Sequence, residues 1–174
     1  MADAFTMLLT GLSGAGKTTN AKMIVTELQN RGIQVELLDG DVVRDEIGNL
    51  FGYTREERNK VSKIHRFLAK MLNRNGISVI VAAISPYEEM RESYRNEIKN
   101  YVEVYVECPI EVCIERDVKG IYQKAIRGEM KHVIGIDESF EVPQNPDIVV
   151  NTSAATTEEN MIQIIEALKE KQFA

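Results

Sequence analysis

Gly11-Leu12-Ser13-Gly14-Ala15-Gly16-Lys17-Thr18 is the stretch that decides the fold of this chain. It matches G-x-x-x-x-G-K-[ST], a glycine-rich loop that wraps the phosphates of ATP or GTP. The glycines let successive backbone N–H groups turn toward phosphate oxygens, and the following helix points its positive end at the same anion. We predict that Lys17 reaches the β- and γ-phosphates and that the Thr18 hydroxyl ligates Mg²⁺, with Thr19 as a weaker additional ligand.

The flanking residues supply the context that this motif needs. Residues 5–10 form a short apolar run typical of a strand. Residues 17–30 have helical spacing, with an apolar face made of Ala21, Ile24, Val25 and Leu28. The alternative is a glycine- and serine-rich turn before an ordinary helix, and the order of strand, loop and helix argues against it.

The composition limits the classes of protein that fit this chain. Its 174 residues, 44% hydrophobic and 28% charged, predict one globular domain. A net charge of −6 disfavours broad nucleic-acid binding, and no apolar stretch approaches the ~20 residues of a membrane span. No basic leader precedes the first strand, so we expect a cytoplasmic protein.

The two cysteines, Cys108 and Cys113, fit neither a zinc pattern nor a C-x-x-C pattern. This predicts reduced, partly buried thiols, with a redox switch as the minor alternative.

A second polar motif, Asp39-Gly40-Asp41, follows the apolar run at residues 33–38. Ligands of open α/β sheets bind at the carboxyl ends of the strands, and carboxylates placed there can hold metal-bound water or accept a proton. The alternative is a capped turn that opens the next helix, since aspartate is a good N-cap. The position one strand after a phosphate loop favours the functional interpretation.

A long amphipathic helix is predicted from the capping box at Thr54 to about Asn75. We expect its buried stripe to consist of Val61, Ile64, Leu68, Met71 and Leu72. Most of its cations are interpreted as solvated, with Arg58 as the best candidate for holding an anionic substrate. His65 is expected at the surface or at the boundary of the core.

The later segments continue the alternation of strands and helices. Residues 77–84 are almost uninterruptedly apolar, as in a strand buried on both faces, and lead into Ser85-Pro86-Tyr87, which fits a ligand loop and a helix start equally well. Further strands are predicted at residues 101–107 and 147–151, and Thr156 caps the last helix. The pattern predicts an α/β fold of the P-loop NTPase type, a three-layer sandwich around a doubly wound parallel sheet.

Residues 117–137, which we name the lid segment, combine many cations with three glycines. In a chain that is acidic overall, this pattern favours a mobile lid that closes over the nucleotides and neutralises phosphate charge. A solvated connector is the alternative.

With these segments in view, the chain resembles the adenylylsulfate (APS) kinases over almost its whole length, as a stand-alone kinase domain. Besides the phosphate loop, the matching stretches are Leu38-Asp39-Gly40-Asp41-Val42-Val43-Arg44, Ile84-Ser85-Pro86-Tyr87, Glu115-Arg116-Asp117-Val118-Lys119-Gly120-Ile121-Tyr122, Gly135-Ile136-Asp137 and Pro143-x-Asn145-Pro146. The family transfers the γ-phosphoryl group of ATP to the ribose 3′-hydroxyl of adenosine 5′-phosphosulfate. The resemblance implies ATP and Mg²⁺ as cofactors, a small nucleotide as substrate and a homodimer.

The resemblance also implies roles for individual residues. Asp41 would act on the acceptor hydroxyl as base or orienter, with Lys17 on the phosphates and Asp39 supporting metal-bound water. Binding of ATP is expected at Gly11, Ser13, Gly14, Ala15, Gly16, Lys17, Thr18, Thr19 and Arg116. Binding of the acceptor is expected at Asp41, Arg44, Tyr53, Arg58, Val61, Ile84, Ser85, Lys119, Lys124 and Val133.

Three departures from the family pattern concern the acceptor. Val61 replaces an asparagine that contacts the nucleotide, Val133 replaces an aromatic that stacks on adenine, and Tyr53 stands where phenylalanine is usual. One alternative is therefore a related 3′-hydroxyl kinase acting on another activated nucleotide, for example cytidine diphosphoramidate. A second alternative is a non-catalytic nucleotide-binding protein, against which the intact Lys17 and Asp41 argue.

Overall fold

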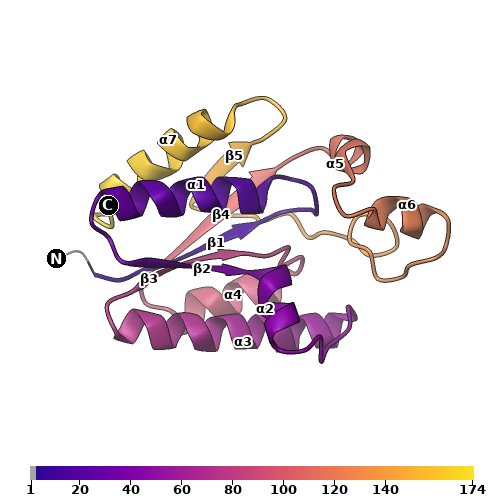
Figure 1. The fold of residues 1–174 in the computed structure, drawn as a ribbon, viewed down its shortest axis with the longest axis horizontal. Helices are drawn as coiled ribbons and strands as arrows, with labels where there is room; N and C mark the ends of the chain where they lie inside the picture. The colour runs from indigo at the N-terminus through magenta and orange to yellow at the C-terminus, as the bar shows by residue number, and fades with distance from the viewer. Residues whose placement is uncertain (1–2) are drawn as a thin grey trace.

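The structure is a computed structural model that describes residues 3–174, in which five parallel strands are sandwiched between two layers of helices (Figure 1). The strands are β1 (Thr6–Thr10), β2 (Val35–Asp39), β3 (Ser78–Ala82), β4 (Tyr101–Glu107) and β5 (Ile148–Asn151). The helices are α1 (Lys17–Asn30), α2 (Gly40–Glu46), α3 (Arg55–Arg74), α4 (Glu88–Glu97), α5 (Ile110–Arg116), α6 (Ile121–Ile126) and α7 (Thr157–Glu170).

The strand order β2-β3-β1-β4-β5 places the first strand in the centre of the sheet. Helices α1 and α7 cover one face, and α3 and α4 cover the other (Figure 1). The register pairs Leu9 of β1 with Ala82 of β3 and with Val104 of β4, so the three inner strands end at the same edge. The loops that leave this edge are therefore brought together, as is usual for ligand sites of open α/β sheets.

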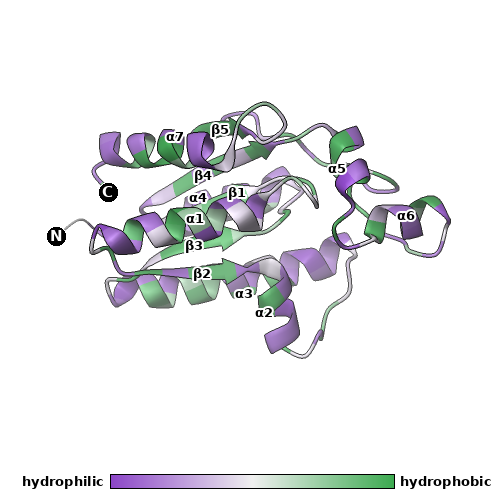
Figure 2. Ribbon diagram, turned by 45° about the horizontal axis from the view of Figure 1, so that its top comes forward, coloured by the Kyte–Doolittle hydropathy of each residue, from purple (hydrophilic) through white to green (hydrophobic). Residues whose placement is uncertain are grey.

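The inner strands of the sheet are largely hydrophobic (Figure 2), and their period-two alternation divides the core between the two faces. In β1, Met7 and Leu9 pack in the cluster that contains Ile24 of α1, whereas Leu8 packs in the cluster that contains Tyr94 of α4. Both faces of β1 are buried, which explains why its sequence is a continuous apolar run rather than an alternating one. The predicted fold class is confirmed.

Local signals in the sequence account for several boundaries. Thr54 caps α3, with its hydroxyl accepting from the Glu57 N–H in a full capping box, and Thr156 caps α7 in the same way. Gly11 is required by a close approach, because a Cβ atom there would lie 2.5 Å from the carbonyl oxygen of Val106 on β4. Within residues 3–174, none of the helices combines the length and the apolar character needed to cross a membrane.

The predicted buried stripe of α3 is partly wrong. Met71 is 41% exposed, and His65, which was expected at the surface or boundary, is only 3% exposed. The helix is rotated so that a more polar stripe faces inward. This orientation is possible because Arg66 pairs with Glu97 of α4 at 3.0 Å and donates to the Ser62 hydroxyl at 2.9 Å, so its buried charge is compensated.

Candidate active site

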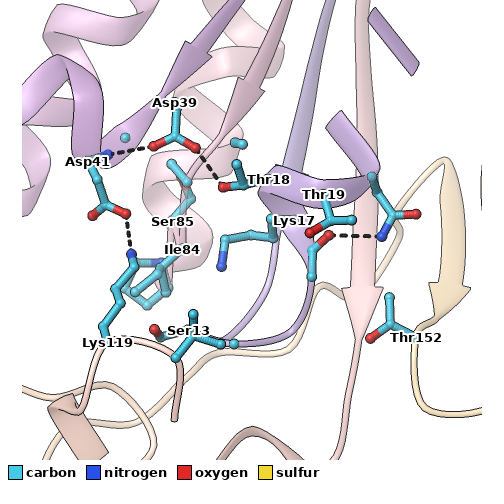
Figure 3. A pocket seen from close by; sticks show the side chains of 18 of the residues that line it. Ser13, Lys17, Thr18, Thr19, Asp39, Asp41, Ile84, Ser85, Lys119 and Thr152 are labelled. Atoms are coloured by element: carbon cyan, nitrogen blue, oxygen red, sulfur yellow. Dashed lines mark hydrogen bonds and ion pairs between the residues drawn. The ribbon is translucent and has the colours of Figure 1, made fainter. Parts of the chain in front are cut away.

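A cavity of about 450 Å³ lies at the edge of the sheet where the strands end (Figure 3). Its walls come from the glycine-rich loop with the start of α1, the end of β2 with α2, one side of α3, and the loops that follow β3 and β5. Lys119 of the lid segment also lines it. The volume is that of a typical small-molecule site.

The glycine-rich loop is held in shape by side chains from distant parts of the chain. The Tyr122 hydroxyl donates to the Ser13 carbonyl at 2.7 Å, and the Thr152 hydroxyl donates to the Ala15 carbonyl at 2.6 Å. Arg116 donates to the carbonyl oxygens of both Gly14 and Thr152. With these carbonyls occupied by protein donors, the shape of the loop is fixed by the protein itself. The N–H groups of Gly11 and Ala15 donate to protein carbonyls, and those at the start of α1 point to where an anion would bind.

Lys17 is half-buried, and its ammonium donates to the carbonyl oxygen of Leu12 at 2.7 Å. Burial of the ammonium, followed by repulsion from Lys119, lowers the pKa of Lys17 to about 8. A cation destabilised in this way gains more from an incoming phosphate than a solvated lysine would.

Asp39 lies between Thr18 and Asp41, and all three line the cavity (Figure 3). The Thr18 hydroxyl donates to Asp39 Oδ2 at 2.6 Å, and the other carboxylate oxygen accepts the backbone N–H of Asp41 at 3.0 Å. Asp39 is thus the N-cap of α2, as one of the two interpretations of this motif predicted. The same carboxylate also faces the Thr18 hydroxyl, so the two interpretations are compatible.

The Asp41 carboxylate is exposed and forms an ion pair with Lys119 (Figure 3). Lys119 comes from the turn between α5 and α6, so this pair joins the lid segment to the end of β2. The lid segment is also packed against the protein where Tyr122, Val133 and Ile134 are buried. Its predicted mobility stays a prediction.

Two buried guanidinium groups line the cavity on the α2 and α3 side. Arg44 and Arg58 are each 8% exposed, and the Cζ atom of Arg44 lies 4.3 Å from the centre of the Tyr53 ring. Arg58 donates to the carbonyl oxygens of Tyr53 and His132, both at 2.9 Å, and burial lowers its pKa. Within residues 3–174, neither arginine has a carboxylate within 4.0 Å. Buried cations are normally paired, so this arrangement fits an anionic ligand.

The loop after β3 also contributes to the cavity, as one interpretation of Ser85-Pro86-Tyr87 predicted. Helix α4 begins only at Glu88, and Ile84, Ser85 and Pro86 line the cavity. Ser85 has a φ of 43°, in the left-handed region, and its carbonyl accepts from Arg91 at 2.8 Å. Strained backbone of this kind is often found at functional sites, where the surrounding structure maintains it.

Most of the predicted site residues line this one cavity, including Ser13, Gly14, Gly16, Lys17, Thr18, Thr19, Asp39, Asp41, Arg44, Tyr53, Arg58, Val61, Ile84, Ser85, Arg116 and Lys119. Four others do not. Gly11 and Ala15 are buried, Lys124 is exposed on α6, and Val133 is packed in the hydrophobic core at 3% exposure. The predicted contact of Val133 with the acceptor stays a prediction.

Several residues of the cavity were not predicted. Ser62 and His65 lie one helical turn beyond Arg58 and Val61, and their position could have been found by extending the i, i+3, i+4, i+7 spacing from Arg58. Thr152 follows β5, and the rule that sites lie at the ends of strands would have indicated it.

Comparison with known proteins identifies close relatives. The family model described as adenylylsulphate kinase matches residues 3–151. The chain is 47% identical over 161 residues to a probable adenylyl-sulfate kinase of Pseudomonas aeruginosa, covering 92% of this chain and 75% of that protein. It is 46% identical over 165 residues to an adenylyl-sulfate kinase of Rippkaea orientalis, covering 95% and 91%. The Mycobacterium tuberculosis APS kinase in complex with AMPPNP and APS superposes with a TM-score of 0.92 at 32% identity, covering 97% of this chain and 99% of that one.

Proposed function

The chain belongs to the adenylylsulphate kinase family, and from this membership we propose that it transfers the γ-phosphoryl group of ATP to the 3′-hydroxyl of adenosine 5′-phosphosulfate. The products are 3′-phosphoadenosine 5′-phosphosulfate (PAPS) and ADP. One observation supports this assignment above the others. A single cavity contains a phosphate loop at the start of α1 and, on α2 and α3, two buried arginines that have no carboxylate partner among the described residues, so it fits two anionic ligands.

The residues of the cavity have different roles in the transfer. The loop amides and Lys17 hold the triphosphate of ATP, while Arg44 and Arg58 hold the anionic end of the acceptor. Asp41 orients the acceptor hydroxyl and takes up its proton. Lys119 exchanges its ion pair with Asp41 for the transferred phosphoryl group, which frees the carboxylate. Transfer through a loose transition state needs mainly alignment and charge neutralisation, and these groups supply both.

The chain also offers a fitting place for Mg²⁺. Within residues 3–174 no group of three or more His, Cys, Asp or Glu side chains could hold a metal ion. The Thr18 hydroxyl and the Asp39 carboxylate, 2.6 Å apart, are oxygen donors beside the phosphate loop. Mg²⁺ is commonly bound by one or two protein oxygens together with substrate phosphates and water, which this pair allows. When bound, Mg²⁺ neutralises the charge on the phosphates.

Asp39→Asn separates the metal role of this side chain from its structural role. Asparagine caps helices as well as aspartate does, so α2 should form and the melting temperature should remain within a few degrees of the wild type. The loss of the anionic oxygen is expected to raise the Mg²⁺ concentration for half-maximal activity by about tenfold or more. A chelator should abolish transfer in both proteins. An unchanged Mg²⁺ requirement in the variant would contradict the assignment of Asp39.

The proposed reaction is tested by measuring ADP release and the 3′-phosphorylated product from ATP, Mg²⁺ and adenosine 5′-phosphosulfate. Cytidine diphosphoramidate serves as a competing acceptor, because Val61, buried at the cavity, favours the alternative in which the nucleotide differs. PAPS formation with the larger kcat/KM supports the proposal. Product from the cytidine compound alone would contradict it and establish the alternative, and product from neither would indicate a binding protein.

A further inference from the structure

The side of α3 that lines the cavity contains a buried polar atom that has no partner in the part of the chain that the structure describes. Arg58, Val61, Ser62 and His65 follow one another along this side at helical spacing. The His65 side chain is 3% exposed, and within residues 3–174 its Nε2 atom has no hydrogen-bond partner. Buried polar atoms are nearly always paired, so an unpaired one in a side chain that lines the cavity is a candidate for a hydrogen bond that forms with the bound ligand.

Neighbouring side chains do not provide the missing partner. The Ser62 hydroxyl accepts a hydrogen bond from Arg66 at 2.9 Å, and Arg66 is in turn paired with Glu97. Arg44, which lies on the cavity side, is a pure donor and repels a charged imidazole. Burial and the nearby Arg44 lower the pKa of His65 to about 4, so its ring is neutral at physiological pH. A neutral imidazole has one donor and one acceptor nitrogen.

The position of His65 assigns it to the acceptor rather than to ATP. Helix α1, which follows the phosphate loop, lies in the opposite layer of the sandwich from α3 (Figure 1). His65 shares its wall with Arg44 and Arg58, the two buried cations that fit the anionic end of the acceptor. Because the arginines satisfy the negative charge, a neutral ring beside them is suited to an uncharged hydrogen-bonding group.

We propose that His65 is a specificity-determining residue of the acceptor site, which hydrogen-bonds an uncharged polar group of the acceptor nucleoside. This inference rests on the proposed function, since it takes adenosine 5′-phosphosulfate as the acceptor. This role explains why His65, whose unpaired Nε2 atom destabilises the folded protein, lies at the cavity side of α3. The unpaired nitrogen is a cost to the free protein that the bound acceptor removes.

The test compares His65→Leu, which fills the space without polar atoms, with His65→Gln, which restores a donor and an acceptor. His65→Leu should raise the KM for adenosine 5′-phosphosulfate by about tenfold or more and leave the KM for ATP unchanged. His65→Gln should recover part of the loss. Lys63→Leu, at an exposed position of the same helix, is the matched control and should change neither constant.

The melting temperature of His65→Leu distinguishes the proposed role from a purely structural one. If His65 only stabilised the fold, the substitution would lower the melting temperature. Without ligands, His65→Leu should melt at or above the temperature of the wild type, because an unpaired buried atom is removed. With AMPPNP present, adenosine 5′-phosphosulfate should raise the melting temperature of the wild type much more than that of the variant.

The outcomes separate this inference from the function on which it rests. A wild-type protein that makes PAPS, together with a His65→Leu variant that has an unchanged acceptor KM, would overturn the role of His65 alone. The same conclusion follows if His65→Leu melts well below the wild type with its acceptor KM unchanged. A wild type that forms no PAPS would overturn the proposed function and the inference with it.

Discussion

Lys17→Ala is expected to lower kcat for phosphoryl transfer by about a thousandfold or more, since we propose that this lysine reaches the phosphates of ATP. In the absence of ligand, its ammonium makes one hydrogen bond, to the Leu12 carbonyl. The loop itself is held by Tyr122 and Thr152, which the substitution does not touch. The variant should therefore fold normally and fail in catalysis.

The measurement is single-turnover transfer with saturating ATP, next to Lys22→Ala as the control. Lys22 is exposed on the same helix, so the control removes an equal charge away from the cavity. It should retain the activity of the wild type. A Lys17→Ala variant with activity within tenfold of the wild type would show that the phosphates bind elsewhere.

Because the pKa of Lys17 is lowered, the affinity for ATP should depend on pH. In the free protein the pKa is about 8, and a bound triphosphate stabilises the charged ammonium and raises it. Binding of ATP above pH 8 therefore takes up a proton. The affinity for ATP should be constant with respect to this group below pH 8 and fall by up to about tenfold per pH unit above it. Lys17→Ala should lack that break, and an identical break in both proteins would assign it to another group.

The residues that could be predicted from the sequence are those whose local pattern determines their surroundings. The glycine loop between an apolar run and a helix was sufficient to place Lys17 and Thr18, because strand, loop and helix follow one another directly. The Asp39 motif was placed by the same reasoning, since it ends the next strand in the chain. In both cases the functional group lies within a few residues of the signal.

The sequence was less informative where burial is decided by contacts from distant parts of the chain. Helix α3 has apolar residues at more than one face, and its orientation depends on Arg66 meeting Glu97 of α4, thirty-one positions away. Hydrophobic spacing alone therefore placed His65 outside and Met71 inside. Val133 was assigned to the acceptor site by resemblance alone; its side chain packs in the core, and its role at the acceptor stays a prediction.

Asp41→Asn is expected to lower kcat by about 10²- to 10⁴-fold, the range typical of a lost general base, while the KM for ATP stays within a few-fold of the wild type. The side chain keeps its size, and the backbone N–H of residue 41 still donates to Asp39, so α2 should be preserved. Asp41 belongs to α2 and not to the phosphate loop. The loss should therefore appear in the chemical step rather than in ATP binding.

Asp45→Asn is the matched control, because Asp45 is an exposed aspartate on the same helix and does not line the cavity. Adding Lys119→Ala to the Asp41→Asn variant and to the Asp45→Asn control tests the ion pair that joins the lid segment to Asp41. If Lys119 acts on the transferred phosphoryl group, its loss should lower kcat even when Asp41 is already asparagine. If its only role is to pair with Asp41, the double variant should be no slower than Asp41→Asn. Activity of Asp41→Asn within fivefold of the wild type would mean that another group receives the proton of the acceptor hydroxyl.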